Sequence, residues 1–166
     1  MGESFEEYVT GRGPALLRVA YLLTQDRHRA EDLLQEVLVK AHRRWRRIDA
    51  PDRYVRRAIL HEYLSWRRRR SSHEAVLDAL PDTAAPGDGG GDPAGPQADR
   101  DAVRAVLAGL PRRQRAVLVL RYYEDLDDRE IAALLGCEIA TVRSIASRAL
   151  ARLRTSNAVH LLTGGE

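Results

Sequence analysis

The stretch from Leu110 to Arg154 constrains the fold of this chain more than any other part of the sequence. Asp127 precedes an apolar-periodic run, and Glu130 follows at the spacing of a capping box, which predicts the start of a helix. Gly136 tolerates the left-handed conformation that ends many helices. A second helix is expected from Thr141 to Arg154. Two helices joined by a glycine-containing turn indicate a helix-turn-helix, whose second helix can enter the major groove of DNA.

The expected second helix has an apolar and a polar side. Helical spacing assigns these residues to the buried side: Val142, Ala146, Ala149, Leu150 and Leu153. The candidate DNA-binding residues face outward or lie in the turn: Glu138, Thr141, Arg143, Ser144, Ser147 and Arg148. Arg143 comes early in the helix and can reach guanine through two hydrogen bonds. Arg148 lies further along, where a helix in the groove meets the DNA backbone, so we assign it to phosphate.

The segments LPRRQRAVLVLRYYEDLDDREIAALLGC and ATVRSIASRALARLR together resemble region 4 of the sigma-70 family of RNA polymerase sigma factors, in its extracytoplasmic-function (ECF) branch. The resemblance implies that this helix-turn-helix reads the −35 element of a promoter. Glu138 stands where the family commonly has serine. Glutamate caps a helix less well and repels phosphate, although in the groove it can accept from a cytosine amino group.

The first half of the chain predicts three more helices. Ser4 and Glu7 can form a capping box, and the Gly11–Pro14 segment is expected to break or bend the helix that follows. Apolar residues recur at helical spacing from Asp26 to Trp45, with acid at the start and base at the end, as the helix dipole favours. Pro51 fits the first position of a third helix.

The segment from Lys40 to Arg70 is strongly basic and carries the interleaved aromatic residues Tyr54, Tyr63 and Trp66. Such a segment can neutralise phosphates and stack on unpaired bases. The alternative is a solvated charged face with its aromatic residues in the core.

This half resembles region 2 of the same family. The segment DRHRAEDLLQEVLVKAHRRW is similar to the helix that docks on core RNA polymerase, and YVRRAILHEYLSWRRRR to the segment that melts and reads the −10 element. The resemblance implies polymerase-binding roles for Asp32, Leu33, Gln35, Glu36 and Val37. It implies contacts with the melted strand for His61, Ser65, Trp66, Arg67 and Arg68. The loop from Arg46 to Asp52 is similar to the one that captures a flipped base in this family, and His61 stands where asparagine is common.

Between these halves lies a segment of different composition. Pro81 to Pro96 is rich in proline, glycine and aspartate and has no large apolar side chain, so it cannot bury enough surface to order itself. We therefore expect an all-α chain with a region 2-like domain at 1–70, a flexible acidic linker at 71–97 and a region 4-like domain at 98–166. The linker is either a soluble tether or, as the resemblance implies, a segment that runs through the polymerase.

The remaining residues favour no catalytic or metal chemistry. Cys137 is the only cysteine, and the five histidines lack the spacing of metal ligands. No cofactor is expected. The acidic N-terminus is unlike a signal peptide, and no apolar run is long enough to span a membrane, so a cytoplasmic protein is expected.

Three functions remain open from the residues. The leading one is a sigma factor that binds core RNA polymerase, duplex −35 DNA and melted −10 DNA, with an anti-sigma factor as a partner that the sequence does not identify. The alternatives are a stand-alone helix-turn-helix regulator and a polymerase-binding adaptor that reads no sequence. The outward polar residues Thr141, Arg143 and Ser144 argue against the adaptor.

Overall fold

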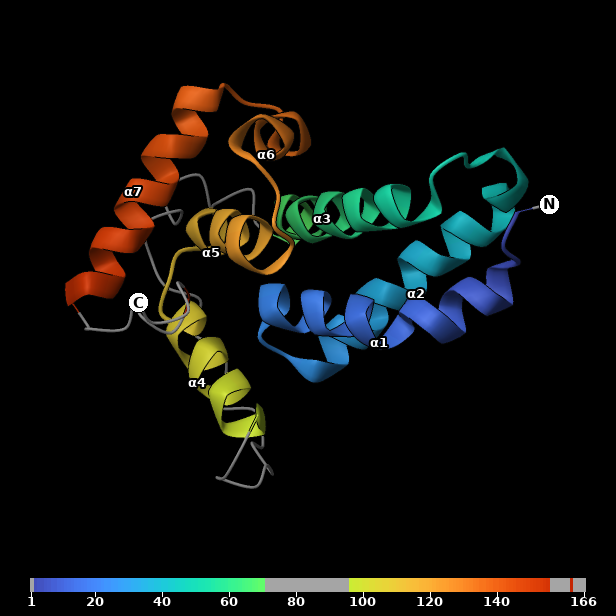
Figure 1. Ribbon diagram of the computed structural model, residues 1–166, viewed down its shortest axis with the longest axis horizontal. Helices are drawn as coiled ribbons and strands as arrows, with labels where there is room; N and C mark the ends of the chain where they lie inside the picture. Colours follow the sequence, from blue (N-terminus) through green and yellow to red (C-terminus); the bar gives the residue numbers. More distant parts are fainter. Residues whose placement is uncertain (1, 71–95, 156–161, 163–166) are drawn as a thin grey trace. The chain divides into compact units, whose positions relative to one another are not determined.

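The computed structural model describes residues 2–70, 96–155 and 162, and the regular elements among them are all helices (Figure 1). Its contacts divide the chain into two compact units, Met1–Ser72 and His73–Glu166. The expectation of two small all-helical domains is therefore confirmed. The predicted linker, apart from its last two positions, lies outside the described residues.

The first unit contains α1 (Phe5–Thr24), α2 (Arg27–Arg44), the 3-10 turn η1 (Trp45–Arg47) and α3 (Pro51–Arg70). The predicted capping box opens α1: the Ser4 hydroxyl accepts from the Glu7 amide at 3.2 Å, and the Glu7 carboxylate accepts from the Ser4 amide at 2.9 Å. Asp26 caps α2 by accepting from the amides of His28 and Arg29. Pro51 is the first residue of α3, as expected.

The three helices of this unit pack around one apolar core. Its largest contributors from α1 and α3 are Tyr8, Leu23, Ile59, Leu60 and Tyr63, and α2 adds Val37 and Ala41. Lys40 ties α2 to α3 because its ammonium contacts Glu62 on α3 as well as Glu36 on its own helix. These two carboxylates, Glu62 first, raise the pKa of Lys40.

Of the break or bend expected at Gly11–Pro14, the break does not occur, because α1 continues through Pro14 to Thr24. A proline inside a helix removes one backbone hydrogen bond and strains one turn. Buried side chains on either side, Tyr8 before the proline and Leu16 after it, hold both parts of α1 in the same core. Tertiary packing therefore outweighs the local preference.

The second unit contains α4 (Pro96–Ala108), α5 (Arg112–Leu118), the π-helical turn η3 (Val119–Tyr123), α6 (Asp128–Leu135) and α7 (Ile139–Thr155). Helix α4 begins at Pro96 rather than near Ala98. Asp127 forms the predicted capping box with Glu130, and Gly136 ends α6 with φ 66°. The π-helical turn was not expected from the sequence.

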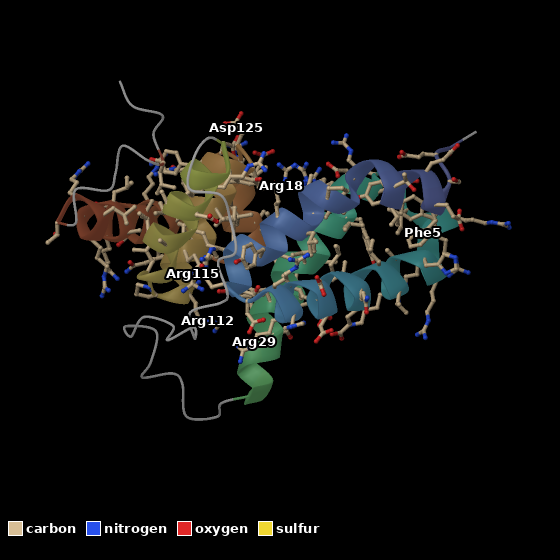
Figure 2. All side chains as sticks on the ribbon, turned by 90° about the horizontal axis from the view of Figure 1, so that it is seen from below. Phe5, Arg18, Arg29, Arg112, Arg115 and Asp125 are labelled. Carbon is tan, nitrogen blue, oxygen red and sulfur yellow. The ribbon has the colours of Figure 1, made fainter. Side chains whose placement is uncertain are left out.

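Arg115 holds the start of this unit together from inside. It lies on α5, its side chain is fully buried, and Figure 2 labels it in the second unit. Its guanidinium donates to three carbonyl oxygens at and just beyond the end of α4: Leu107 at 2.9 Å, Ala108 at 3.3 Å and Leu110 at 3.2 Å. The last carbonyls of a helix have no partner within the helix. Arg115 supplies donors to the carbonyls of Ala108 and Leu110, and adds a second donor to the Leu107 carbonyl, which also accepts from the Leu110 amide at 3.1 Å.

Candidate nucleic-acid and polymerase interfaces

Helix α7 presents a polar face to solvent. Val142, Ile145, Ala146, Ala149 and Leu153 are buried, while Leu150 is only half-buried. The predicted DNA-binding residues lie on the opposite side: Arg143, Ser147 and Arg148 are exposed, and Thr141 and Ser144 are half-buried. Exposed Glu138 directly precedes the helix, and its carbonyl accepts from the amides of Thr141 and Val142. The sequence thus assigned the faces of this helix correctly apart from two residues: Ile145, whose burial it did not predict, and Leu150, which is less buried than expected.

A hollow of about 450 Å³ lies between α5 and this polar face. Arg113 and Gln114 line it from α5, and Thr141, Ser144 and Arg148 line it from α7. The buried Oε1 atom of Gln114 has no hydrogen-bond partner within the described part of the chain. Sequence reasoning missed these two α5 residues, because the LPRRQR motif that contains them served only to identify the family.

A charged cluster lies where α6 begins. Asp128 accepts from Nη2 of Arg121 with both carboxylate oxygens, at 2.7 and 2.9 Å. Its Oδ2 atom also accepts from Nε of Arg143 on α7, at 3.4 Å. The predicted base-reading arginine is therefore in contact with a carboxylate, a pairing that was not expected from the sequence.

The outer face of α2 carries the candidate polymerase-binding residues. Asp32, Gln35 and Glu36 are exposed, and Val39 continues their stripe with 54% of its surface exposed. Leu33 and Val37, which the resemblance also assigns to polymerase binding, are only 8% and 0% exposed, although Leu33 lines a hollow together with Asp32 and Glu36. Helical spacing places both on the buried stripe of α2.

On α3, His61 and Ser65 are exposed one turn apart, as a strand-binding role requires. Tyr63 is 2% exposed and belongs to the core, so for this residue the alternative of a core aromatic holds and stacking on an unpaired base does not. Trp66, Arg67 and Arg68 lie within α3, but their side chains are outside the described residues.

An aromatic cluster joins the start of α1 to the end of α2. The Phe5 ring lies 4.7 Å from that of His42 and 5.3 Å from that of Trp45, and Figure 2 labels Phe5 at this end of the unit. These residues line a hollow of about 690 Å³ that the basic residues Arg43, Arg44, Arg46 and Arg47 also line. The hollow adjoins the loop that resembles the base-capturing segment.

Tyr8 ties this end of the unit to the start of α3. Its hydroxyl donates to Asp52 at 3.3 Å. Burial first, and then the nearby Asp52 carboxylate, raise the pKa of Tyr8. The phenol is therefore held in its neutral form, as a donor.

Two kinds of site are missing from the portions of the chain that the structure covers. No group of three or more histidine, cysteine, aspartate or glutamate residues there could hold a metal ion. None of the helices traced in the same residues has the length and apolar character needed to span a membrane.

Both units of the chain match known protein families. The family description "Sigma-70 region 2" matches residues 9–73, and "Sigma-70, region 4" matches residues 100–153. The RNA polymerase sigma-E factor of Streptomyces coelicolor is 42% identical over 93% of this chain and 87% of its own length. The protein of the same name from Streptomyces avermitilis is 40% identical over 90% and 83%.

A more distant relative and a solved structure agree with these matches. The ECF RNA polymerase sigma factor SigE of Mycolicibacterium smegmatis is 31% identical over 95% of this chain and 63% of its own length. The fold matches the sigma factor RpoE of Bartonella quintana, solved in complex with the anti-sigma factor NepR, with a TM-score of 0.62, 24% identity and 96% coverage of both chains. The chain therefore belongs to the sigma-70 family of RNA polymerase sigma factors, in its ECF branch.

Proposed function

We propose that this protein binds core RNA polymerase and directs it to a specific set of promoters. The observation that carries the proposal is that region 2 and region 4 both match within one chain, and each matched unit has an exposed polar face. A stand-alone helix-turn-helix regulator would not account for the region 2 match.

The docking surface on polymerase is the face of α2 formed by Asp32, Gln35, Glu36 and Val39. Carboxylates beside an exposed valine suit a partner surface that combines basic and apolar side chains. Since Leu33 and Val37 are buried, their role is to hold α2 in its core and so to orient this face.

The duplex −35 element is read by the polar face of α7. Arg143 contacts a base edge, while Arg148 contacts phosphate. Arg113 and Gln114 extend this face across the hollow between α5 and α7, where they can reach the backbone of the same DNA.

The melted −10 strand runs along α3. His61 and Ser65 contact it directly, and the arginines that end this helix neutralise its phosphates. The hollow beside Phe5, His42 and Trp45 has the aromatic and basic lining that an unpaired base needs.

A subunit of this kind acts with polymerase and DNA, which places it in the cytoplasm. It is a recognition subunit and not an enzyme. An anti-sigma factor, such as the one bound to the solved relative, would compete for the same two surfaces.

The experiment that tests the function is transcription in vitro. The protein is combined with core RNA polymerase and genomic DNA, and the 5′ ends of the transcripts are sequenced. We expect starts at promoters that share two sequence elements. Starts no different from those of core enzyme alone would refute the proposal.

A charge-reversal pair tests the docking surface. Asp32→Lys should weaken binding to core polymerase, because it places a positive charge in the acidic face. Glu6→Lys is the matched control, since Glu6 is exposed and lies beside the opposite end of α2, in the hollow that Arg47 also lines. Equal affinity of both variants for core polymerase would remove α2 as the docking element.

A further inference from the structure

Asp128 joins three elements of the second unit through one carboxylate. It is the first residue of α6, it accepts from Arg121 on the π-helical turn, and it accepts from Arg143 on α7. The side chains of Asp128 and Arg121 are 20% and 26% exposed, whereas that of Arg143 is 71% exposed. The Asp128 carboxylate is therefore mostly buried, whereas the Arg143 side chain that it contacts extends into solvent.

The contact between Asp128 and Arg143 uses only one of the N–H donors of Arg143. The Nε atom donates to Asp128, so this bond does not use the N–H groups of the two terminal nitrogens of the guanidinium. A guanine edge is recognised by two N–H groups of a planar guanidinium. Arginine otherwise loses considerable side-chain freedom when it is ordered on DNA. A carboxylate at Nε orders the side chain before DNA arrives.

Arg121 explains how a carboxylate can lie so close to a DNA-binding face. A lone carboxylate there would repel phosphate. Both oxygens of Asp128 already accept from Arg121, and the cluster of two arginines and one aspartate keeps a formal positive charge. Arg121 also fixes the position of the carboxylate, because it lies on a different element from both Asp128 and Arg143.

We infer that Asp128 is a positioning residue, which directs Arg143 and thereby sets base preference at one position of the upstream promoter element. The inference rests on the proposed function, in which the polar face of α7 reads duplex DNA. It adds a requirement that this function does not contain, namely that Arg143 reads a base only while Asp128 holds its Nε.

The test measures initiation by the full chain with core RNA polymerase. The templates carry each of the four bases at every position of the −35 element. Arg143→Ala should reduce discrimination at one position by roughly tenfold. Asp128→Ala should reduce discrimination at the same position by at least threefold and should add nothing when Arg143 is already alanine. Asp128→Asn, which keeps the size and one acceptor oxygen, should fall between wild type and Asp128→Ala.

Glu130→Ala is the matched control. Glu130 is exposed in the same first turn, and its carboxylate accepts from the Asp127 amide at 2.9 Å instead of from an arginine. This variant should lower the thermal unfolding midpoint without changing base preference. If Asp128→Ala lowers the midpoint so far that the protein is unfolded, Asp128→Asn carries the comparison.

Several results would overturn the inference. Equal losses on every template for both Asp128 variants would mean that Asp128 only supports the fold. A rise in initiation on every template would mean that Asp128 merely competes with DNA for Arg143. If Arg143→Ala itself shows no base-dependent loss, then the base-reading role of α7 in the proposed function fails together with the inference. A base-dependent loss for Arg143→Ala without coupling to Asp128 leaves the proposed function intact and removes the inference alone.

Discussion

Replacing Arg115 by methionine should destabilise the second unit more than any other exchange of a single arginine on α5. Methionine retains an unbranched apolar stem of similar length but donates no hydrogen bond. The carbonyl oxygens of Leu107, Ala108 and Leu110 would each lose the bond that Arg115 now supplies. The end of α4 would then carry buried acceptors without these donors.

The burial of these bonds sets the size of the effect. The bonds to Leu107 and Leu110 are buried, while the bond to Ala108 is partly buried, so water can replace it. A buried acceptor left without its donor costs about 1–3 kcal/mol. The Leu110 carbonyl is in that position, whereas the Leu107 carbonyl keeps its bond from the Leu110 amide at 3.1 Å and loses only a second bond, worth about 0.5–1.5 kcal/mol. The two bonds together predict a loss of about 1.5–4.5 kcal/mol. Folded domains have only about 5–15 kcal/mol of total stability, so this is a large fraction.

Urea unfolding of the full chain, followed by circular dichroism, measures this loss as a change in the free energy of unfolding. Arg113→Met is the matched control, because Arg113 lies on the same helix but is half-buried and lines the hollow facing α7. We expect the control to stay within about 0.5 kcal/mol of wild type, as most surface substitutions do. A loss below about 1 kcal/mol for Arg115→Met would refute the reasoning that the guanidinium caps α4.

Three further outcomes follow from the structure. Burial, and then Asp52, raise the pKa of Tyr8, so the first unit should keep its full stability below the ordinary tyrosine pKa of about 10 and lose stability as pH rises above it. In urea titrations at alkaline pH, Tyr8→Phe should not show this loss. Gly136→Ala should cost about 1 kcal/mol in the free energy of unfolding, because φ is 66° while an added Cβ meets no atom within 4 Å; a larger loss would indicate a steric cause. Arg148→Ala should weaken promoter binding evenly across sequences and lower the slope of log K against log salt by about one, and a base-dependent loss would contradict its assignment to phosphate.

The sequence predicted the elements whose signals are local. The capping boxes at Ser4 and Asp127 and the left-handed Gly136 all appear as expected, because each depends only on residues within one turn. The break expected at Gly11–Pro14 did not appear, because packing on both sides of Pro14 decides that question and a local pattern does not contain it.

The candidate sites were predictable to the extent that exposure follows helical spacing. The faces of α7 were assigned almost completely, but Leu33 and Val37 were placed on the polymerase-binding surface because a family motif runs through both faces of α2. The contacts of Arg115 with α4 and of Asp128 with Arg143 join separate elements, so no spacing rule could reveal them. The polymerase and DNA roles of the individual residues stay predictions.

The π-helical turn from Val119 to Tyr123 makes this part of the chain sensitive to deletion. The amide of Glu124 donates to the carbonyl of Val119 at 3.0 Å, so the turn contains one residue more than an α-helical turn would. Each residue of an α-helix turns the chain by about 100°. Deleting one residue here, which would restore an ordinary α-helix, would therefore carry Arg121 away from Asp128 and present another side chain in its place. Small changes of length at this point thus offer a way to alter promoter preference without changing α7, the helix that we propose reads the DNA.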